Sequence, residues 1–181
     1  GLVGSEMCIR DRFSNLEIRK GSIFDSGCNT LVNTVNTRGV MGKGIALEFK
    51  RRLEKTDYFY DYQTKCQQQQ VKLGEPYLWR PKPALPNFDL PLPDKISEKN
   101  ILNFPTKGHW KDKSRVADIE QGLRFFIQQY HHWHIDSIAF PALGCGLGGL
   151  AWEQIRPIMC KYLSTISARV EIYPPPGALL E

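Results

Sequence analysis

Two glycine-rich loops, each placed directly after an apolar run, constrain this 181-residue chain more than any other feature. The first loop follows the run 30–35 and contains GVMGKG at residues 39–44, and the second follows 137–143 and contains GCGLGG at 144–149. A helix pattern begins after each loop. A strand that delivers a glycine loop to a helix N-terminus exposes backbone N–H groups, and these groups together with the helix dipole favour phosphate. The pair of loops therefore predicts a site for a ligand that carries a diphosphate.

The remaining sequence alternates between strand and helix patterns. This alternation predicts a layered α/β domain, with helices on both faces of a mostly parallel or mixed sheet. Apolar residues at helical spacing predict helices over 44–55, 57–70, 116–130 (capped by Ser114) and 152–163. Shorter apolar runs predict strands over 16–20, 30–35, 74–80, 100–106, 137–143 and 170–173. Prolines at 81, 83, 86, 91 and 93 predict a loop over 81–99.

The length fits one domain with a single sizeable core. Residues 1–13 show no period that matches the rest, and we expect them to be a non-native or disordered extension. The domain is expected to occupy residues 14–176. Residues 177–181 end the segment PPPGALLE, which is expected to be a C-terminal tail because prolines prevent ladder pairing.

Composition narrows the class of protein. Hydrophobic residues make up 41% and charged residues 24%, as in ordinary soluble domains. A net charge of +5 is compatible with a polyanionic partner. The five cysteines form no CxxC pair, which favours a reducing compartment, and no apolar run is long enough to span a membrane, so we expect a cytoplasmic protein with no membrane partner. The sequence HHWH at 131–134 fits a helix C-terminus better than a metal site, and no metal or cofactor is indicated.

The first glycine loop matches neither of the standard nucleotide-binding motifs. The P-loop of nucleoside-triphosphate-binding proteins requires Ser or Thr directly after GK, whereas Lys43 is followed by Gly44 and Ile45. The dinucleotide fingerprint also requires an acidic residue at a distance where none is found. Ordinary tight turns are the alternative interpretation. The density of glycine favours close approach of a ligand to the backbone, because a turn usually needs only one glycine.

Two side chains invite a catalytic interpretation. Cys145 lies between glycines near a helix start, where a thiolate is favoured, although a small residue there also fits simple packing. Lys107 follows the apolar run 101–104 at the carboxyl end of a predicted strand. Open α/β sheets place ligands at that edge, so Lys107 is the stronger candidate, with an ordinary surface lysine as the alternative.

Three ordered blocks carry a resemblance to a known family. They are LVNTVNTRGVMGKGIALEFK at 31–50, NFPTKGHWKDKSRVADIEQGL at 103–123 and PALGCGLGGLAW at 141–152. The chain resembles the macrodomains, which bind ADP-ribose, and among them the macrodomain of DNA ADP-ribosyl glycohydrolase antitoxins of the DarG type. The resemblance covers about residues 14–176. It implies a three-layer α/β/α fold with a mixed sheet of about six strands.

The resemblance also implies which residues bind ADP-ribose. They come from the turn after the first strand, the end of the second strand and both glycine loops. They are Ser22, Ile23, Asn33, Asn36, Gly39, Val40, Met41, Gly42, Gly44, Ile45, Gly144, Cys145, Gly146, Leu147 and Gly148.

The implied activity is an ADP-ribosyl glycohydrolase that removes ADP-ribose from thymidine bases in single-stranded DNA, reversing the modification made by a toxin. Lys107 matches the lysine to which this branch assigns catalysis. It can attack the anomeric carbon, trap the opened sugar as a Schiff base or stabilise the leaving base, and the sequence does not choose among these. The residues expected to contact DNA are His109, Trp110, Lys111 and Lys113. The implied partners are ADP-ribose, modified DNA and a cognate ADP-ribosyltransferase toxin.

Two departures from the family pattern bear on the substrate. Many macrodomains bind the adenine amino group with an aspartate where this chain has Ser22. Relatives that act on protein glutamate carry an aspartate where this chain has Gly148, and its absence favours the DNA-type branch. The alternatives are a non-catalytic reader of ADP-ribose and a hydrolase of protein-linked or small-metabolite ADP-ribose.

Overall fold

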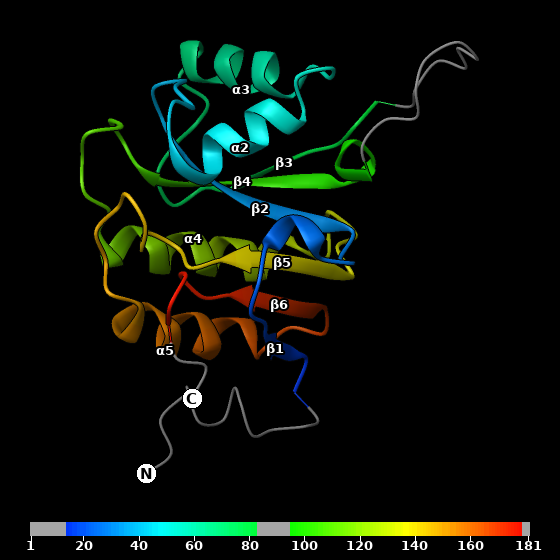
Figure 1. Cartoon of the computed structure of the whole chain (residues 1–181), viewed down its shortest axis with the longest axis vertical. Helices are drawn as coiled ribbons and strands as arrows, with labels where there is room; N and C mark the ends of the chain where they lie inside the picture. The colour runs from blue at the N-terminus through cyan, green and yellow to red at the C-terminus, as the bar shows by residue number, and fades with distance from the viewer. Residues whose placement is uncertain (1–13, 83–94, 179–181) are drawn as a thin grey trace.

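The computed structural model describes residues 14–82 and 95–178, and strands and helices alternate along them (Figure 1). The strands are β1 (Leu16–Ile18), β2 (Thr30–Asn36), β3 (Tyr77–Trp79), β4 (Asn100–Lys107), β5 (Ser137–Pro141) and β6 (Arg169–Tyr173). The helices are α2 (Gly44–Arg52), α3 (Tyr58–Gln67), α4 (Val116–Gln129) and α5 (Trp152–Leu163), with short 3₁₀ turns η1 (Ile23–Asp25) and η2 (Lys95–Glu98). The expected extension 1–13, most of the proline loop and residues 179–181 lie outside the described residues.

The six strands form one mixed sheet in the order β1-β6-β5-β2-β4-β3. Strand β3 runs antiparallel to β4, and every other neighbouring pair is parallel. The strands that follow β2 in the chain, β3 and β4, lie on one side of it, whereas β6, which follows β5, lies on the other side of β5. The strand order therefore reverses between β2 and β5, which is the point where open α/β sheets form a ligand crevice at their carboxyl ends.

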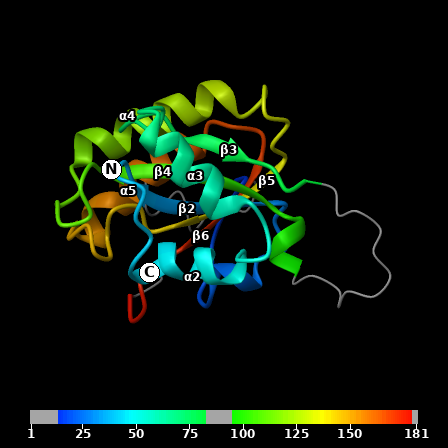
Figure 2. The same ribbon diagram turned by 90° about the horizontal axis from the view of Figure 1, so that it is seen from above.

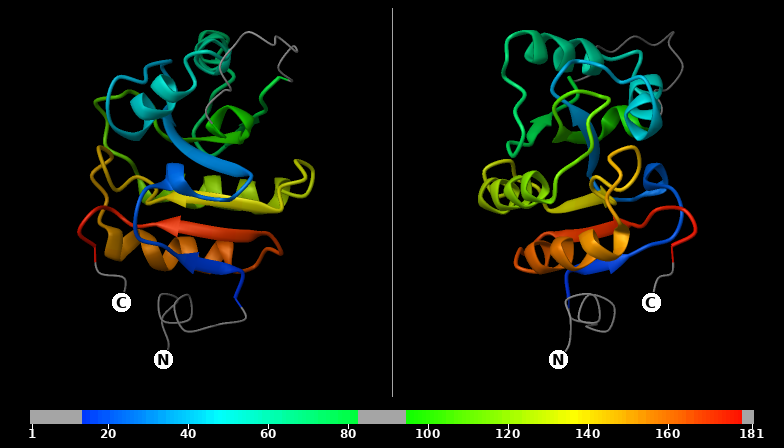
Figure 3. Two further views of the ribbon diagram at one scale, coloured as in Figure 1. Left: turned by 45° about the vertical axis from the view of Figure 1, so that its right-hand side comes forward. Right: turned by 90° about the vertical axis from the view of Figure 1, so that its left-hand side faces the viewer.

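Helices cover both faces of the sheet (Figures 2 and 3). Helices α4 and α5 pack on one face around Phe104, Leu123 and Ile155, while α2, α3 and η1 pack on the other around Phe49 and Tyr58. The two apolar clusters are separated by the sheet, because alternate strand side chains point to opposite faces. The expected three-layer α/β/α fold with a mixed sheet is confirmed.

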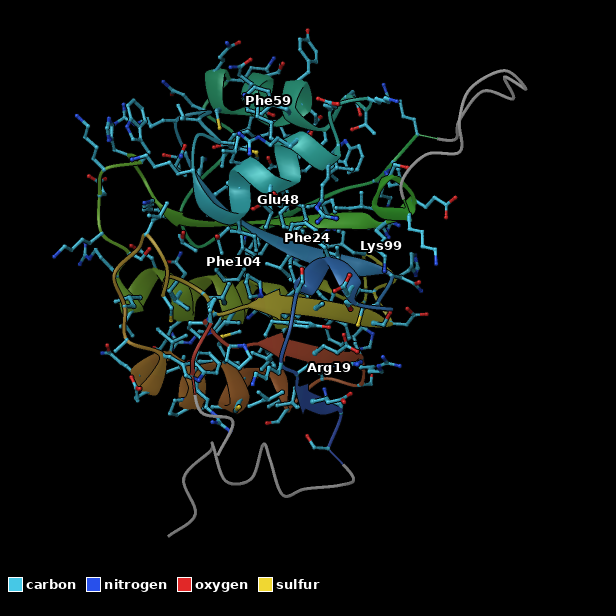
Figure 4. The ribbon with its side chains drawn as sticks, viewed as in Figure 1. Arg19, Phe24, Glu48, Phe59, Lys99 and Phe104 are labelled. Carbon is cyan, nitrogen blue, oxygen red and sulfur yellow. The ribbon has the colours of Figure 1, made fainter. Side chains whose placement is uncertain are left out.

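Side chains also fix the elements to one another on the α2 face, where Figure 4 labels Phe24 of η1 and Glu48 of α2. Phe24 packs against Phe49 with ring centroids 4.7 Å apart, and the Arg52 guanidinium lies 4.3 Å from the Phe24 ring centroid. Arg52 also forms an ion pair with Glu48 one turn earlier on α2. These contacts hold η1 beside α2, close to the cavity described below.

Two local predictions, on a helix cap and on a loop, differ from the structure. The helix over 116–130 begins without a side-chain cap: Arg115 occupies the N-cap position, and the Ser114 hydroxyl makes no capping bond. The Ser114 backbone N–H instead donates to the Gly148 carbonyl oxygen, 2.9 Å away. The predicted loop 81–99 ends in η2, because residues 95–98 follow the last proline and can form a 3₁₀ turn.

Within the described ranges, no helix combines the length and apolarity that a membrane span requires.

Candidate ligand cavity and active site

A cavity of about 870 Å³ opens at the carboxyl ends of β2, β4, β5 and β6. It lies at the reversal point of the strand order, where the loops after β2, β4 and β5 gather on the left of Figure 1. The predicted residues that line it are Ile23, Asn36, Val40, Gly42, Gly44, Ile45, Lys107, Trp110, Lys111, Gly144, Cys145, Gly146, Leu147 and Gly148. Both glycine loops therefore face one cavity, whose size suits a dinucleotide-sized ligand.

The first glycine loop is folded around the side chain of Asn36. Its Oδ1 accepts hydrogen bonds from the backbone N–H of Arg38, 2.9 Å away, and of Val40, 3.4 Å away. Its Nδ2 donates to the Val40 carbonyl oxygen at 2.7 Å. The next residue, Thr37, donates to the Gly108 carbonyl oxygen from both its backbone N–H and its hydroxyl, at 3.0 and 3.1 Å. The loop is thus tied to the segment that directly follows Lys107.

The second glycine loop is closed by its own backbone and by Ser114. The Leu150 N–H donates to the Gly144 carbonyl oxygen at 2.9 Å, and the Ser114 N–H donates to Gly148. A Cβ at Gly148 would collide with the Ser114 hydroxyl and would lie 2.6 Å from the Gly144 carbonyl oxygen. Glycine is therefore required at 148 by packing, and this position has no room for a larger side chain such as aspartate.

Two other glycines have no such reason in the fold. Gly42 and Gly146 both lack a positive φ, and a Cβ at Gly146 would meet no atom within 4 Å. A Cβ at Gly42 would make only an ordinary contact, 3.6 Å from a Val40 methyl. Both line the cavity. Close approach of a ligand remains as the physical explanation for glycine at these two positions.

Lys107 ends β4 at the rim of the cavity. Asn36 lies opposite it in the register of β2 and β4, after a bulge between Val35 and Asn36. The Lys107 ammonium donates to the Trp110 carbonyl oxygen, 2.8 Å away. Trp110 is 45% exposed, and its ring stacks on His109 with centroids 3.8 Å apart. An amine, an amide and an exposed aromatic ring are therefore brought to one end of the cavity.

Cations are concentrated in two segments that reach this end, and three of them, Lys43, Lys107 and Lys111, line the cavity. The segments are 37–44 and 107–115, which are joined by the bond from Thr37 to Gly108. The cations are Arg38, Lys43, Lys107, Lys111, Lys113 and Arg115, and none forms an ion pair with any described residue. The single carboxylate in these segments, Asp112, accepts a bond from the His109 backbone N–H at 2.9 Å. The opening is therefore electropositive, which favours a polyanion.

Cys145 does not fit a nucleophilic role. Burial, reinforced by the nearby charge of Glu153, raises the pKa of its thiol to about 11. The thiol donates to the Leu143 carbonyl oxygen, 3.6 Å away. Since the thiolate is the reactive form, a raised pKa disfavours catalysis by this residue, and the packing interpretation holds.

Six predicted contact residues do not line the cavity: Ser22, Asn33, Gly39, Met41, His109 and Lys113. Asn33 is fully buried and donates to the Tyr58 hydroxyl at 2.7 Å, so direct contact with a ligand in the cavity does not fit its position. Met41 is buried behind the loop, and Gly39 packs against α3. The Ser22 hydroxyl accepts from the Phe24 N–H and so caps η1. These four residues therefore lie outside the cavity lining.

The cavity also contains residues that the sequence analysis missed. Lys43 lines it beside the start of α2, as do Tyr173 and the three prolines 174–176. Lys43 lies in the first glycine loop, and a cation between two glycines is a signal that the sequence itself contains. The sequence predicts the prolines to be part of a terminal segment, and only the pairing of β6 between β1 and β5 brings them to the site.

A buried carboxylate supports the Tyr173 end of the cavity. Glu171 accepts hydrogen bonds from the Ser26 hydroxyl at 2.6 Å, the Tyr173 hydroxyl at 2.9 Å, Arg169 at 2.8 Å and Arg19 at 3.0 Å. Burial by itself would raise the pKa of Glu171, but these four bonds outweigh it and hold the pKa at about 2. Across the described segments, no three His, Cys, Asp or Glu side chains are grouped so as to bind a metal ion.

Comparisons with known proteins agree with this geometry. A family model described as Macro domain matches residues 32–159. A DNA ADP-ribosyl transferase-DNA ADP-ribosyl glycohydrolase fusion protein of Thermosipho africanus is 41% identical over 165 residues, which are 89% of this chain and 42% of that protein. A DNA ADP-ribosyl glycohydrolase of Thermus aquaticus is 35% identical over 162 residues, 88% of this chain and 41% of that protein. The chain thus spans less than half the length of these curated relatives.

Solved structures show the same likeness. The macrodomain of Mycobacterium tuberculosis DarG superposes with a TM-score of 0.75 at 35% identity, over 88% of this chain and 97% of that chain. Thermosipho africanus DarTG in complex with ADP-ribose gives a TM-score of 0.79 at 39% identity, over 91% of this chain and 43% of that chain. The chain belongs to the macrodomain family, and within that family it is similar to the DarG macrodomains.

Proposed function

We propose that this domain is a DNA ADP-ribosyl glycohydrolase, which hydrolyses the N-glycosidic bond between ADP-ribose and a thymine base in single-stranded DNA. The observation that carries the proposal is the grouping of Lys107, Asn36 and Trp110 at the electropositive end of a cavity lined by two glycine loops. The names of the relatives from Thermosipho africanus and Thermus aquaticus support the same activity.

ADP-ribose fits the rest of the cavity. The backbone N–H groups of the two glycine loops and of the first turn of α2 are suited to the diphosphate. Ile23 and Tyr173 provide apolar surface at the far end, where the adenosine is expected. The reacting ribose then lies beside Asn36 and Lys107. The ADP-ribose complex of the Thermosipho africanus relative supports this assignment.

In the proposed reaction, the bond between the anomeric carbon and the base nitrogen breaks, and water supplies the hydroxyl to the sugar and the proton to the base. Positive charge develops on the sugar as the base leaves. Lys107 acts on this step by attack on the anomeric carbon, by trapping the opened sugar or by stabilising the leaving base. Its position at the end of a rigid strand holds the amine close to the reacting atoms.

The DNA strand is proposed to enter over the segment 107–115. In this proposal Lys111 and Lys113 contact phosphates, and the exposed Trp110 stacks on a base. His109 backs this ring and fixes its orientation. The substrate requires an enzyme that attaches ADP-ribose to DNA, and one relative contains such a transferase in the same polypeptide. A DNA ADP-ribosyltransferase toxin is therefore the proposed partner.

The test compares release of ADP-ribose from a thymidine-ADP-ribosylated oligonucleotide by the unchanged protein and by Lys107→Ala. We expect the substitution to lower turnover on the order of 100-fold or more while leaving the affinity for free ADP-ribose within about threefold. Lys55→Ala, an exposed lysine outside the cavity, is the matched control and should behave as the unchanged protein.

Protein-linked ADP-ribose and small ADP-ribose esters are assayed in parallel. If only these substrates are turned over, the domain acts on them and not on modified DNA. Binding of ADP-ribose without turnover of any substrate would make the domain a reader. Loss of both binding and turnover in Lys107→Ala would assign the lysine to ligand binding.

A further inference from the structure

Helix α3 reaches the ligand cavity through one hydroxyl group. Tyr62 is fully buried, and its hydroxyl lies 2.8 Å from the Asn36 carbonyl oxygen and 2.9 Å from Asn36 Oδ1. Both atoms are acceptors, so the single hydroxyl proton is shared between them. Burial raises the pKa of Tyr62 well above its ordinary value, so the hydroxyl keeps its proton at any physiological pH.

This contact restricts what the Asn36 amide can do. Its Oδ1 faces three donors, namely the Tyr62 hydroxyl and the N–H groups of Arg38 and Val40. An amide turned by 180° would point its NH₂ group at those donors, so this orientation is excluded. One Nδ2 hydrogen is used by the Val40 carbonyl oxygen. The other Nδ2 hydrogen remains available to a ligand, because Asn36 lines the cavity.

Helix α3 also supports the first glycine loop at a second point. The Cα of Gly39 faces Gln63 and Cys66 of α3 closely enough that a Cβ there would lie 3.5 Å from Cys66 Cβ. The loop is therefore held from behind by α3 at residue 39 and at Asn36, and from the side by the bond from Thr37 to Gly108. Of these supports, Tyr62 is the only side chain of α3 that hydrogen-bonds to a cavity-lining residue among the described residues.

We infer that Tyr62 is a positioning residue: by donating to Asn36 it holds the amide N–H toward the bound sugar and fixes the first glycine loop for ADP-ribose. This inference rests on the proposed binding of ADP-ribose in the cavity. No residue of α3 lines the cavity, so the inference gives this helix an indirect function in ligand recognition.

Tyr58, one turn earlier on the same helix, provides a matched control. It is also fully buried, and its hydroxyl bonds to the side chains of Asn33 and Asn103. Neither asparagine lines the cavity. Removing either hydroxyl takes hydrogen bonds away from buried polar groups, so both Tyr→Phe variants are expected to lose stability. Only the Tyr62 variant loses a bond to a cavity residue.

The experiment measures ADP-ribose affinity by calorimetry for the unchanged protein, Tyr62→Phe and Tyr58→Phe, at a temperature where all are folded. We expect Tyr62→Phe to weaken binding about five- to tenfold and Tyr58→Phe to stay within about twofold. In an Asn36→Ala background, Tyr62→Phe should add no further loss, because its effect passes through Asn36. In NMR spectra, the Asn36 side-chain NH₂ signal should shift in Tyr62→Phe and not in Tyr58→Phe.

Unchanged affinity in Tyr62→Phe would overturn the inference. So would an equal loss in Tyr58→Phe, or a full additional loss on top of Asn36→Ala. A protein that binds ADP-ribose but releases none from DNA would contradict the proposed activity and leave these affinity measurements to decide the function of Tyr62. On an active protein, the loss in kcat/KM for the DNA adduct should be at least as large as the loss in affinity.

Discussion

At the residue scale, two glycines of the second loop serve different purposes although they lie two positions apart. Gly148 is enclosed by Ser114 and by the Gly144 carbonyl oxygen, whereas Gly146 faces open space in the cavity. A side chain at 148 therefore disturbs the fold, while a side chain at 146 disturbs only a ligand. Glycine is needed for packing at position 148 and for ligand binding at position 146.

This difference predicts opposite outcomes for two substitutions. Gly146→Val should leave the unfolding temperature nearly unchanged and weaken ADP-ribose binding by about tenfold or more, because the branched side chain occupies ligand space. Gly148→Ala should lower the free energy of unfolding by about 1–3 kcal/mol, the usual cost of overpacking. Thermal unfolding and calorimetry of both variants check this. A destabilised Gly146→Val that still binds would refute the assignment.

At the element scale, α2 begins at the cavity without a side-chain cap. Lys43 occupies its N-cap position and makes no capping bond, and the first residues Gly44, Ile45 and Ala46 line the cavity. The unsatisfied N–H groups of a helix start carry partial positive charge. They are left free for an anionic ligand, and the N-cap lysine adds a full positive charge beside them. This arrangement favours ligand binding over helix stability.

Replacing Lys43 should therefore separate stability from binding. Lys43→Asp introduces a favoured N-cap, which is expected to stabilise the helix by about 0.5–2 kcal/mol. The carboxylate also occupies the free N–H groups and repels a diphosphate, so ADP-ribose affinity should fall by at least about tenfold. Ala151→Ser, at the uncapped start of α5 and outside the cavity, is the control and should gain stability without losing affinity. Tighter binding in Lys43→Asp would contradict this interpretation.

At the scale of the whole molecule, Glu171 joins segments that are far apart in the chain. Its carboxylate holds Arg19 after β1, Ser26 after η1 and two residues of β6 around one buried point. The pKa of Glu171 lies at about 2 in the folded protein, below that of an unfolded glutamate. Ionised Glu171 therefore contributes stability that is complete above about pH 4.5 and is lost as the pH falls toward 2.

This linkage predicts how stability depends on pH. When the pH falls from about 5 to about 2.5, the free energy of unfolding should fall by up to about 3 kcal/mol more in the unchanged protein than in Glu171→Gln. At neutral pH the variant should be less stable, since two arginines and two hydroxyls lose their shared acceptor. Glu17→Gln removes an exposed carboxylate 4.0 Å from the same Arg19 and should change little. Denaturant unfolding at several pH values measures all three proteins, and equal acid sensitivity in Glu171→Gln would rule out this origin.

Much of the fold was predictable from local sequence. The apolar periods gave the order of strands and helices, because each element must bury one face, and the two glycine loops and Lys107 were identified at strand ends. Helix ends were less accurate: the helix predicted over 57–70 is observed as Tyr58–Gln67. Ser114 was misassigned as a cap because its backbone bonds to Gly148, which no local pattern reveals.

The composition of the site depended on tertiary structure. Asn33 and Asn36 stand in the same short motif, VNTVN. In the fold, with a bulge before Asn36 and hydrogen bonds to buried tyrosines of α3, Asn36 lines the cavity and Asn33 does not. Pro174–Pro176 reach the site only because β6 pairs between β1 and β5. Local sequence determined the elements, since periodicity and glycine act within a few residues. Contacts between distant segments decided which of the similar side chains meet the ligand, and those contacts exist only in the folded chain.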